Sequence, residues 1–160
     1  MAYTTINDPG SFFNIVNYSG TGSSNAVTGV GFQPDFIWIK ERTGTESDYL
    51  CDSVRGVTKY SQCNTDGAQG TDVNADGFTV GSQSQVNTSS ETYASWNWKA
   101  GTTSGITGGD ITPSSYSYNT TSGFSILKYS GNGSSTQTIP HGLGKVPKMV
   151  WYKRTDSTGN

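Results

Sequence analysis

Short apolar runs, rich in aromatic and β-branched residues, recur along the chain between segments rich in Gly, Asn and Ser. Runs of this length bounded by turn-forming residues are typical of β-strands linked by turns. The pattern predicts strands at residues 12–18, 36–40, 78–80, 92–99, 124–129 and 149–153.

Two of these predicted strands differ in how their apolar residues are spaced. In residues 92–99 the apolar Ala94, Trp96 and Trp98 alternate with largely polar positions, so one face is expected to lie in the core and the other in solvent. Residues 36–39 are continuously apolar, which predicts a strand covered on both faces.

The chain also contains an internal repeat. Residues 13–24 return as residues 124–135, both with the pattern Tyr-Ser-Gly-x-Gly-Ser-Ser, and residues 29–40 return as residues 142–153 with Gly-x-Gly-x-x-Pro and Trp-x-Lys. The first copy continues far beyond this match, whereas the second stops soon after it. We therefore expect the strand at 149–153 to pair with the first copy, with another subunit or with further polypeptide, because an unpaired strand edge promotes aggregation.

The turns and loops carry their own signals. Each copy has two glycines after its tyrosine, and a positive φ angle is expected at both for a tight connection between antiparallel strands. These glycines are Gly20, Gly22, Gly131 and Gly133. Residues 64–77 show no apolar periodicity and are expected to form a long exposed loop.

Composition strengthens the β interpretation. Ser, Thr, Gly and Asn make up nearly half of the 160 residues, only 14% are charged, and strong helix formers are scarce. We predict an all-β, antiparallel sandwich or jelly-roll-like module, whose truncated second repeat completes a sheet or an oligomer contact. The predicted divisions are an N-terminal arm at 1–11, a first repeat at 12–100, a Gly/Ser/Thr-rich connection at 101–122 and a truncated repeat at 123–160.

Charge and hydropathy exclude several partners. The net charge is −2 and no Lys/Arg cluster is present, so nucleic acid is not an expected partner. No stretch is apolar and long enough to span a membrane, and the first residues lack the features of a secretory signal. Cys51 and Cys63 are expected to be free thiols for a chain made in the cytoplasm, with a disulfide as the open alternative.

No catalytic site is predicted. His141 is the only histidine, and it lies in a repeat turn where the first copy has Thr28, so a structural role is favoured over that of a general base. The three glutamates show no pattern of paired acids on one strand. We therefore expect that the chain is not an enzyme and that it needs no cofactor.

Asp72, Asn74 and Asp76 match the first half of a calcium loop, and Gly77 follows them. The twelfth position is Gln83, where such loops supply a bidentate glutamate. A turn rich in Asp and Asn is therefore the favoured interpretation, and calcium is a weak alternative.

Asp52 and Arg55 bring an acid and a base into a region with few charges. A local salt bridge at a turn is the favoured interpretation. Sugar recognition through Arg55 and a neighbouring aromatic ring is the alternative.

Five motifs occur in a fixed order: Tyr-x-Gly-x-Gly-Ser, then Gly-x-Gly-x-x-Pro with Trp-x-Lys, then Asp52-Ser-Val-Arg-Gly, Asp76-Gly-Phe and Ala94-Ser-Trp-Asn-Trp-Lys-Ala-Gly. Together they resemble a family of tailed-phage virion proteins, commonly tail fibres or spikes, and a capsid decoration protein is also compatible. The resemblance implies a place on the virion exterior after synthesis in the host cytoplasm and release by lysis. It implies trimers and contacts with other virion proteins, and it supplies no catalytic residues.

The favoured function is therefore structural, with burial of complementary surface across symmetric contacts. Trp38, Trp151 and Tyr152 are the candidate anchors, and Asp52 and Arg55 are further interface or ligand candidates. The alternative is a carbohydrate-binding module that recognises a host surface glycan. A polysaccharide depolymerase fragment is the least favoured function because no catalytic site is visible.

Overall fold

The computed structural model describes residues 7–56, 59–61, 66–68 and 71–156. Nearly all of its regular structure is β, as predicted, with one 3-10 turn, η1 (Pro9–Ser11), and one short helix, α1 (Ser84–Asn87). The strands are β1 (Phe13–Ser19), β2 (Asn25–Val27), β3 (Phe36–Glu41), β4 (Tyr49–Asp52), β5 (Lys59–Ser61), β6 (Asp66–Ala68), β7 (Asp72–Asn74), β8 (Gly77–Val80), β9 (Thr92–Trp98), β10 (Ser115–Asn119) and β11 (Phe124–Lys128).

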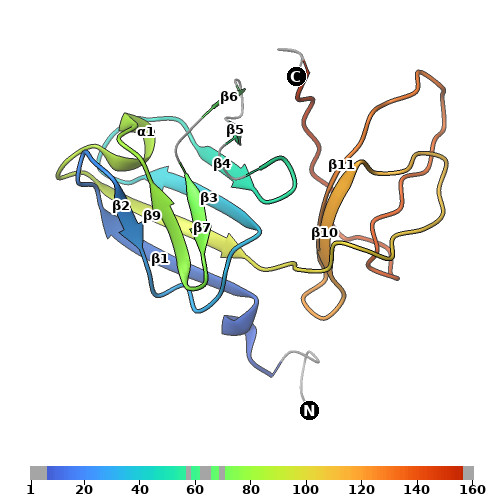
Figure 1. The fold of residues 1–160 in the computed structure, drawn as a ribbon, viewed down its shortest axis with the longest axis horizontal. Helices are drawn as coiled ribbons and strands as arrows, with labels where there is room; N and C mark the ends of the chain where they lie inside the picture. The colour runs from blue at the N-terminus through green and yellow to red at the C-terminus, as the bar shows by residue number, and fades with distance from the viewer. Residues whose placement is uncertain (1–6, 57–58, 62–65, 69–70, 157–160) are drawn as a thin grey trace.

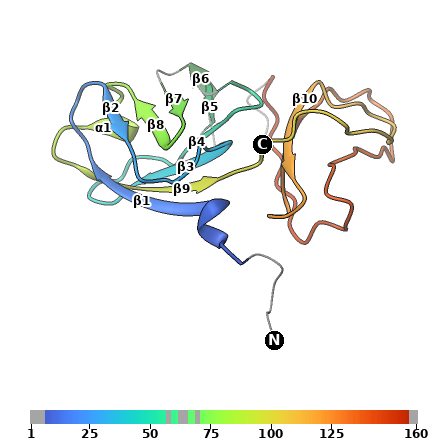
Figure 2. The ribbon, with the colours of Figure 1, turned by 60° about the horizontal axis from the view of Figure 1, so that its bottom comes forward.

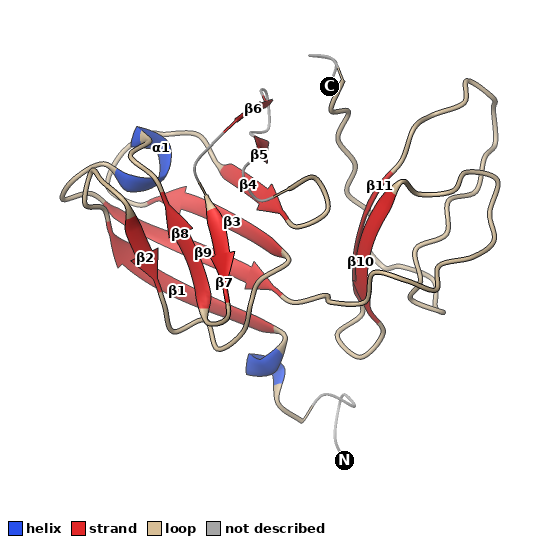
Figure 3. Ribbon diagram, viewed as in Figure 1, coloured by secondary structure: helices blue, strands red, loops and turns tan. Residues whose placement is uncertain are grey.

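The strands form three antiparallel sheets (Figures 1 and 3). The main sheet has the order β1-β9-β3-β4-β5-β6, and a second sheet has the order β2-β8-β7. Strands β10 and β11 form a separate hairpin beside the main sheet. The views in Figures 1 and 2 place the β2-β8-β7 sheet over one face of the main sheet, which makes a sandwich.

The core lies between the two layers of the sandwich. Ile37 and Ile39 of β3 point inward and are 1% and 0% exposed, while Phe78 and Val80 of β8 close the core from the other sheet. The alternating burial of β3 follows from the period of two residues along a strand. The partly buried residues of its other face, Phe36 and Trp38, are covered by aromatic rings, so both faces of this strand are packed, as predicted.

Strand β9 has two distinct faces, as the alternation predicts, and its more polar face is turned toward the core. Tyr93, Ser95 and Asn97 are buried in the sandwich, whereas Trp96 and Trp98 lie half-buried on the outer face. Alternation predicts two faces but not which one is inner. The polar side chains are accommodated because both bond to the backbone of β1: the Ser95 hydroxyl donates to a carbonyl at 3.2 Å, and the Asn97 amide does so at 3.2 Å.

Two predictions about segments are wrong, and a third segment contains a strand that was not predicted. Residues 149–153 form no strand, because no described residues offer them the paired edge that β9 and β4 give to β3. The expected loop at 64–77 contains β6 and β7, and Thr71 between them is 1% exposed. The expected connection at 101–122 contains β10.

The turn glycines were predicted correctly at one position of each pair. Gly22 and Gly133 have φ angles of 73° and 76°, as expected for the tight turn. Gly20 is not in this region, and its role is a close approach: a Cβ atom there would lie 2.0 Å from the carbonyl oxygen of Thr88. Gly131, the counterpart of Gly20, has no such neighbour within 4 Å.

Candidate functional site

The outer face of the main sheet carries a ladder of aromatic rings across three strands. Residues paired across the strands bring Phe13 and Phe36 to either side of Trp98, with ring centroids 4.9 and 5.3 Å away. In the same way Trp38 lies next to Trp96 at 5.7 Å. Ring pairs at these distances attract each other beyond the effect of buried area.

Two aromatic residues of the second repeat pack on this ladder. Each holds the same repeat position as a residue that belongs to the ladder. Phe124, the counterpart of Phe13, stacks on Trp98 with 6.0 Å between centroids. Trp151, the counterpart of Trp38, lies against Trp38 at 5.6 Å in an edge-on arrangement. The indole nitrogen of Trp38 is buried and has no hydrogen-bond partner among the described residues.

Beyond these contacts, the C-terminal segment is apolar and open to solvent. We call residues 146–152 the apolar segment. Its exposed side chains are Val146 at 82%, Met149 at 78%, Val150 at 71%, Trp151 at 55% and Tyr152 at 83%. Places where several apolar side chains are exposed together are often binding surfaces.

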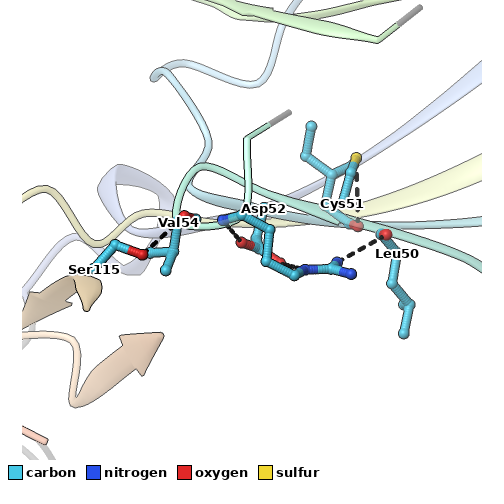
Figure 4. A network of polar contacts seen from close by, with 7 residues as sticks. Leu50, Cys51, Asp52, Val54 and Ser115 are labelled. Atoms are coloured by element: carbon cyan, nitrogen blue, oxygen red, sulfur yellow. Dashed lines mark hydrogen bonds and ion pairs between the residues drawn. The ribbon is translucent and has the colours of Figure 1, made fainter. Parts of the chain in front are cut away.

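The predicted pair of Asp52 and Arg55 is present, at the end of β4 (Figure 4). The Asp52 carboxylate accepts the backbone amide of Arg55 at 2.7 Å and also binds its guanidinium group. The two side chains are 5% and 15% exposed, and the guanidinium donates further to the carbonyl of Leu50. The turn that follows is linked to β10, because the Ser115 hydroxyl donates to the carbonyl of Val54 at 3.1 Å.

Asp35 joins the main sheet to the β10–β11 hairpin. One of its carboxylate oxygens accepts the hydroxyls of Ser53 and Ser117 at 2.8 and 2.9 Å, and the other accepts the amide of Ala100 at 2.8 Å. Sequence reasoning missed this residue. The available signal was a difference within the repeat, because the matching position after the proline is Lys148.

A groove of about 610 Å³ lies at this junction. The side chains that line it include Gln33, Asp35, Lys99, Thr103, Ser114 and Tyr116. Most of the residues around it carry polar side chains, and Tyr116 contributes an aromatic ring whose hydroxyl accepts the amide of Ile106 at 3.2 Å. A surface of this kind offers hydrogen bonds and a stacking ring to a polar ligand.

The suggested calcium loop is a turn in the structure, between β7 and β8. The side-chain oxygen of Asn74 accepts the amide of Asp76 at 3.2 Å, which is an Asx turn. The Asp76 carboxylate accepts the amides of Gly29 and Gly31 at 3.1 and 2.7 Å, and these hydrogen bonds lower the pKa of the carboxyl group. In the described ranges, no three or more His, Cys, Asp or Glu side chains are grouped as a metal site would need.

The structure brings together some predicted site residues and leaves others apart. Trp38 and Trp151 are in contact, and Asp52 and Arg55 form an ion pair, but no ring contact or hydrogen bond among the described residues joins these two pairs. Tyr152 points to solvent. Cys51 is a buried free thiol, and Cys63 lies outside the described residues. No helix in the part of the chain that the structure describes has the length and hydrophobicity to cross a membrane.

Comparison with known proteins identifies a family but no characterised relative. Residues 8–160 match the model of a family described as a domain of unknown function, DUF7483. No curated protein matches the chain. No solved structure matches it either.

Proposed function

We propose that this chain, which belongs to the DUF7483 family, is a structural module that assembles symmetrically with copies of itself through the apolar segment. The observation that carries the proposal is the exposure of Met149, Val150 and Trp151 on one short stretch. We further propose a tailed-phage particle as the setting, on its exterior, because the motifs of the chain resemble virion proteins.

The chemistry of the apolar segment is that of an interface core. Tyr, Trp and Met are enriched in the centres of protein interfaces, and a few such residues carry most of the binding energy. Trp151 is already held by Trp38, so less conformational entropy is lost when a partner covers it.

The charges around the segment indicate the complementary surface. Four of the ten Lys and Arg residues of the chain fall within residues 145–154, although the net charge is −2. They are Lys145, Lys148, Lys153 and Arg154. The rim is therefore basic, and we expect the surface that it meets on a neighbouring copy to be acidic.

Sedimentation velocity over a range of concentrations tests symmetric assembly. The wild-type chain is expected to form a trimer, and Val150→Asp is expected to shift it to the monomer, because a buried unpaired carboxylate opposes association. Thr121→Asp, in the exposed β10–β11 turn, is the matched control and should assemble like wild type. A wild-type chain that stays monomeric throughout contradicts the proposal.

Quantitative mass spectrometry of purified particles tests the setting. Hundreds of copies per particle indicate capsid decoration, and a few dozen or fewer indicate a fibre or spike. Absence of the chain from particles of the phage that encodes it contradicts a virion role.

A second candidate function, carbohydrate binding, is favoured by the groove that Tyr116, Lys99 and other polar residues line. A sugar ring would stack on the tyrosine while its hydroxyls bond to the neighbouring polar groups. A glycan array tests this function. Binding to one sugar class that is lost in Tyr116→Ala supports it, and no binding to any class contradicts it.

A further inference from the structure

One edge of β11 has no strand beside it among the described residues. Strand β11 pairs with β10, and the sheet contains only these two strands. The carbonyl of Lys128 accepts the amide of Ser114, so Lys128 faces β10. Because successive residues of a strand direct their backbone groups to opposite edges, Ser125 and Leu127 face the other, open edge.

The first repeat shows what fits such an edge. Its matching strand, β1, pairs with β9, and the hydrogen bonds at the ends of this ladder involve Phe12 and Gly20. The even-numbered residues of β1 therefore face β9. Their counterparts, 111 positions later, are the odd-numbered residues of β11, so the open edge of β11 is the edge that β1 gives to β9.

The second repeat also retains the loop that accompanies this edge. In the first repeat, the Asn14 side chain donates to the carbonyl of Val30 at 3.2 Å in the Gly-x-Gly loop. In the second, the counterpart Ser125 donates through its hydroxyl to the carbonyl of His141 in the matching loop at 2.7 Å. Both repeats thus tie the strand to its loop by a side-chain hydrogen bond to a loop carbonyl, although the acceptor His141 matches Thr28 and not Val30.

In the first repeat, β9 and the turn before it contact Tyr18 and Gly20. The matching residues of the second repeat have no such contacts with the described residues. Tyr18 stacks on Tyr93 with 5.1 Å between centroids and donates to the carbonyl of Val86 at 2.7 Å. Its counterpart Tyr129 is 41% exposed and has no ring contact or hydrogen bond with another described residue. The space beside Gly131 is open where the Thr88 carbonyl fills the space beside Gly20.

We propose that the open edge of β11 binds an antiparallel strand donated by a different protein, with the side-chain alternation of β9. This alternation sets Tyr, Ser and Asn on one face against small residues and Trp on the other. Strand addition to an exposed edge is a known mode of protein recognition, in which backbone hydrogen bonds give affinity and side chains give specificity. The proposal goes beyond the assembly function above, because the partner is a different protein and the surface is the edge of β11, not the apolar segment.

A second copy of this chain is not the proposed donor. Strand β9 lies between β1 and β3 and is hydrogen-bonded on both edges, so a folded copy cannot release it without losing its main sheet. A donor needs a segment of this chemistry that is free before binding.

The register of the complex follows from the first repeat. Transferring the pairing of β1 with β9 sets Asn97, Ser95 and Tyr93 of a β9-like peptide opposite Ser125, Leu127 and Tyr129. The amide of Ser95 would then donate to β11, and the amide of Trp96 would point away from it.

A synthetic peptide with the sequence of residues 91–99 provides the probe. Amide hydrogen exchange of the full chain is followed by NMR with and without this peptide. The amides of Ser125 and Leu127 are expected to gain protection on binding, whereas Ile126 and Lys128 are already protected by β10. The same peptide N-methylated at Ser95 should bind about tenfold more weakly, as expected for one or two lost backbone hydrogen bonds. N-methylation at Trp96 is the matched control and should leave binding to β11 intact.

A variant of the chain tests the side-chain part of the site. Tyr129→Ala is expected to weaken peptide binding, and its thermal midpoint is compared with that of wild type to separate lost binding from lost stability. Thr121→Ala, in the adjacent turn, should bind the peptide like wild type.

Three results would overturn the strand proposal: no binding of the unmodified peptide, binding without protection of Ser125 and Leu127, or protection of these amides by self-association alone. Failure of the assembly function is distinguishable. If the peptide does not bind but Val150→Asp still disrupts oligomers, only strand addition is wrong. If the peptide binds as expected to a chain that is monomeric at every concentration, only symmetric self-assembly is wrong.

Discussion

Trp151 packs edge-on against Trp38, and the two residues hold the same position in successive repeats. In the first repeat, Trp38 lies in a strand between two others, whereas Trp151 lies in a segment that pairs with no strand among the described residues. One motif therefore serves two purposes in this molecule. The first copy builds the sheet, and the second uses the same side chain to attach itself to that sheet.

Trp151→Ala should detach the apolar segment from the aromatic ladder. We expect a loss of about 1 kcal/mol in the free energy of unfolding, the usual value of one aromatic pair beyond burial. Trp38 would become more exposed, so the tryptophan emission should shift to longer wavelength. Urea unfolding and fluorescence measure both effects. Tyr152→Ala removes a ring that is 83% exposed and should change neither; equal losses in the two variants would contradict the packing.

Asp76→Asn should lower the thermal midpoint at neutral pH, because a neutral amide is a weaker acceptor for the amides of Gly29 and Gly31. The folded-state pKa of Asp76 is lowered, so its contribution is complete above the unfolded pKa of about 3.9 and is lost as the pH falls through the folded pKa. The difference from wild type should therefore shrink in acid.

Asp48→Asn serves as the control for that experiment, since the Asp48 carboxylate has no hydrogen bond to another described residue. Its thermal midpoint should follow wild type at each pH. A difference between Asp76→Asn and wild type that stays constant down to strong acid would show that the carboxylate charge is not the cause.

Cys51 should resist thiol reagents in the folded protein. Its side chain is fully buried, and burial raises the pKa of the thiol to about 12, so almost no reactive thiolate is present at neutral pH. In a Cys63→Ser variant, Ellman's reagent should find no thiol under native conditions and one thiol in guanidinium chloride. Rapid labelling of the native variant would contradict the burial.

Arg55→Ala should destabilise the fold by about 2 kcal/mol, because it leaves a buried carboxylate with only part of its hydrogen bonding. Arg154→Ala removes the arginine of an exposed pair with Asp156 and should have no measurable effect. Urea unfolding of both variants separates the two cases. Equal stabilities of the two variants would show that Asp52 does not depend on Arg55.

The strands that could be predicted from the sequence are those whose own residues carry a strong apolar pattern, such as β1, β3 and β9. Strand β10 was missed because its residues are Ser-Tyr-Ser-Tyr-Asn, and its pairing comes from β11 and the contacts of Ser117. The pattern at residues 149–153 matches β3 closely and forms no strand. Side-chain pattern is a local property, but a strand also needs a neighbour's edge.

The candidate site was predictable to a similar extent. The repeat and the spacing of charges indicated Trp38, Trp151 and the Asp52–Arg55 pair. The role of Asp35 depends on Ser53 and Ser117, which lie 18 and 82 residues away, so no local pattern could reveal it. Phe124 was predicted only as part of a strand, although its match to Phe13 identified it as a repeat position.

The link between Asp35 and Ser117 has a consequence for the order of events during assembly. It fixes β10 to the main sheet through groups that take no part in the open edge of β11. The hairpin is therefore held in place without a partner, so the proposed donor strand would meet an edge that is already formed. Association would then be a single docking step whose rate depends on encounter, and not a process in which folding waits for the partner.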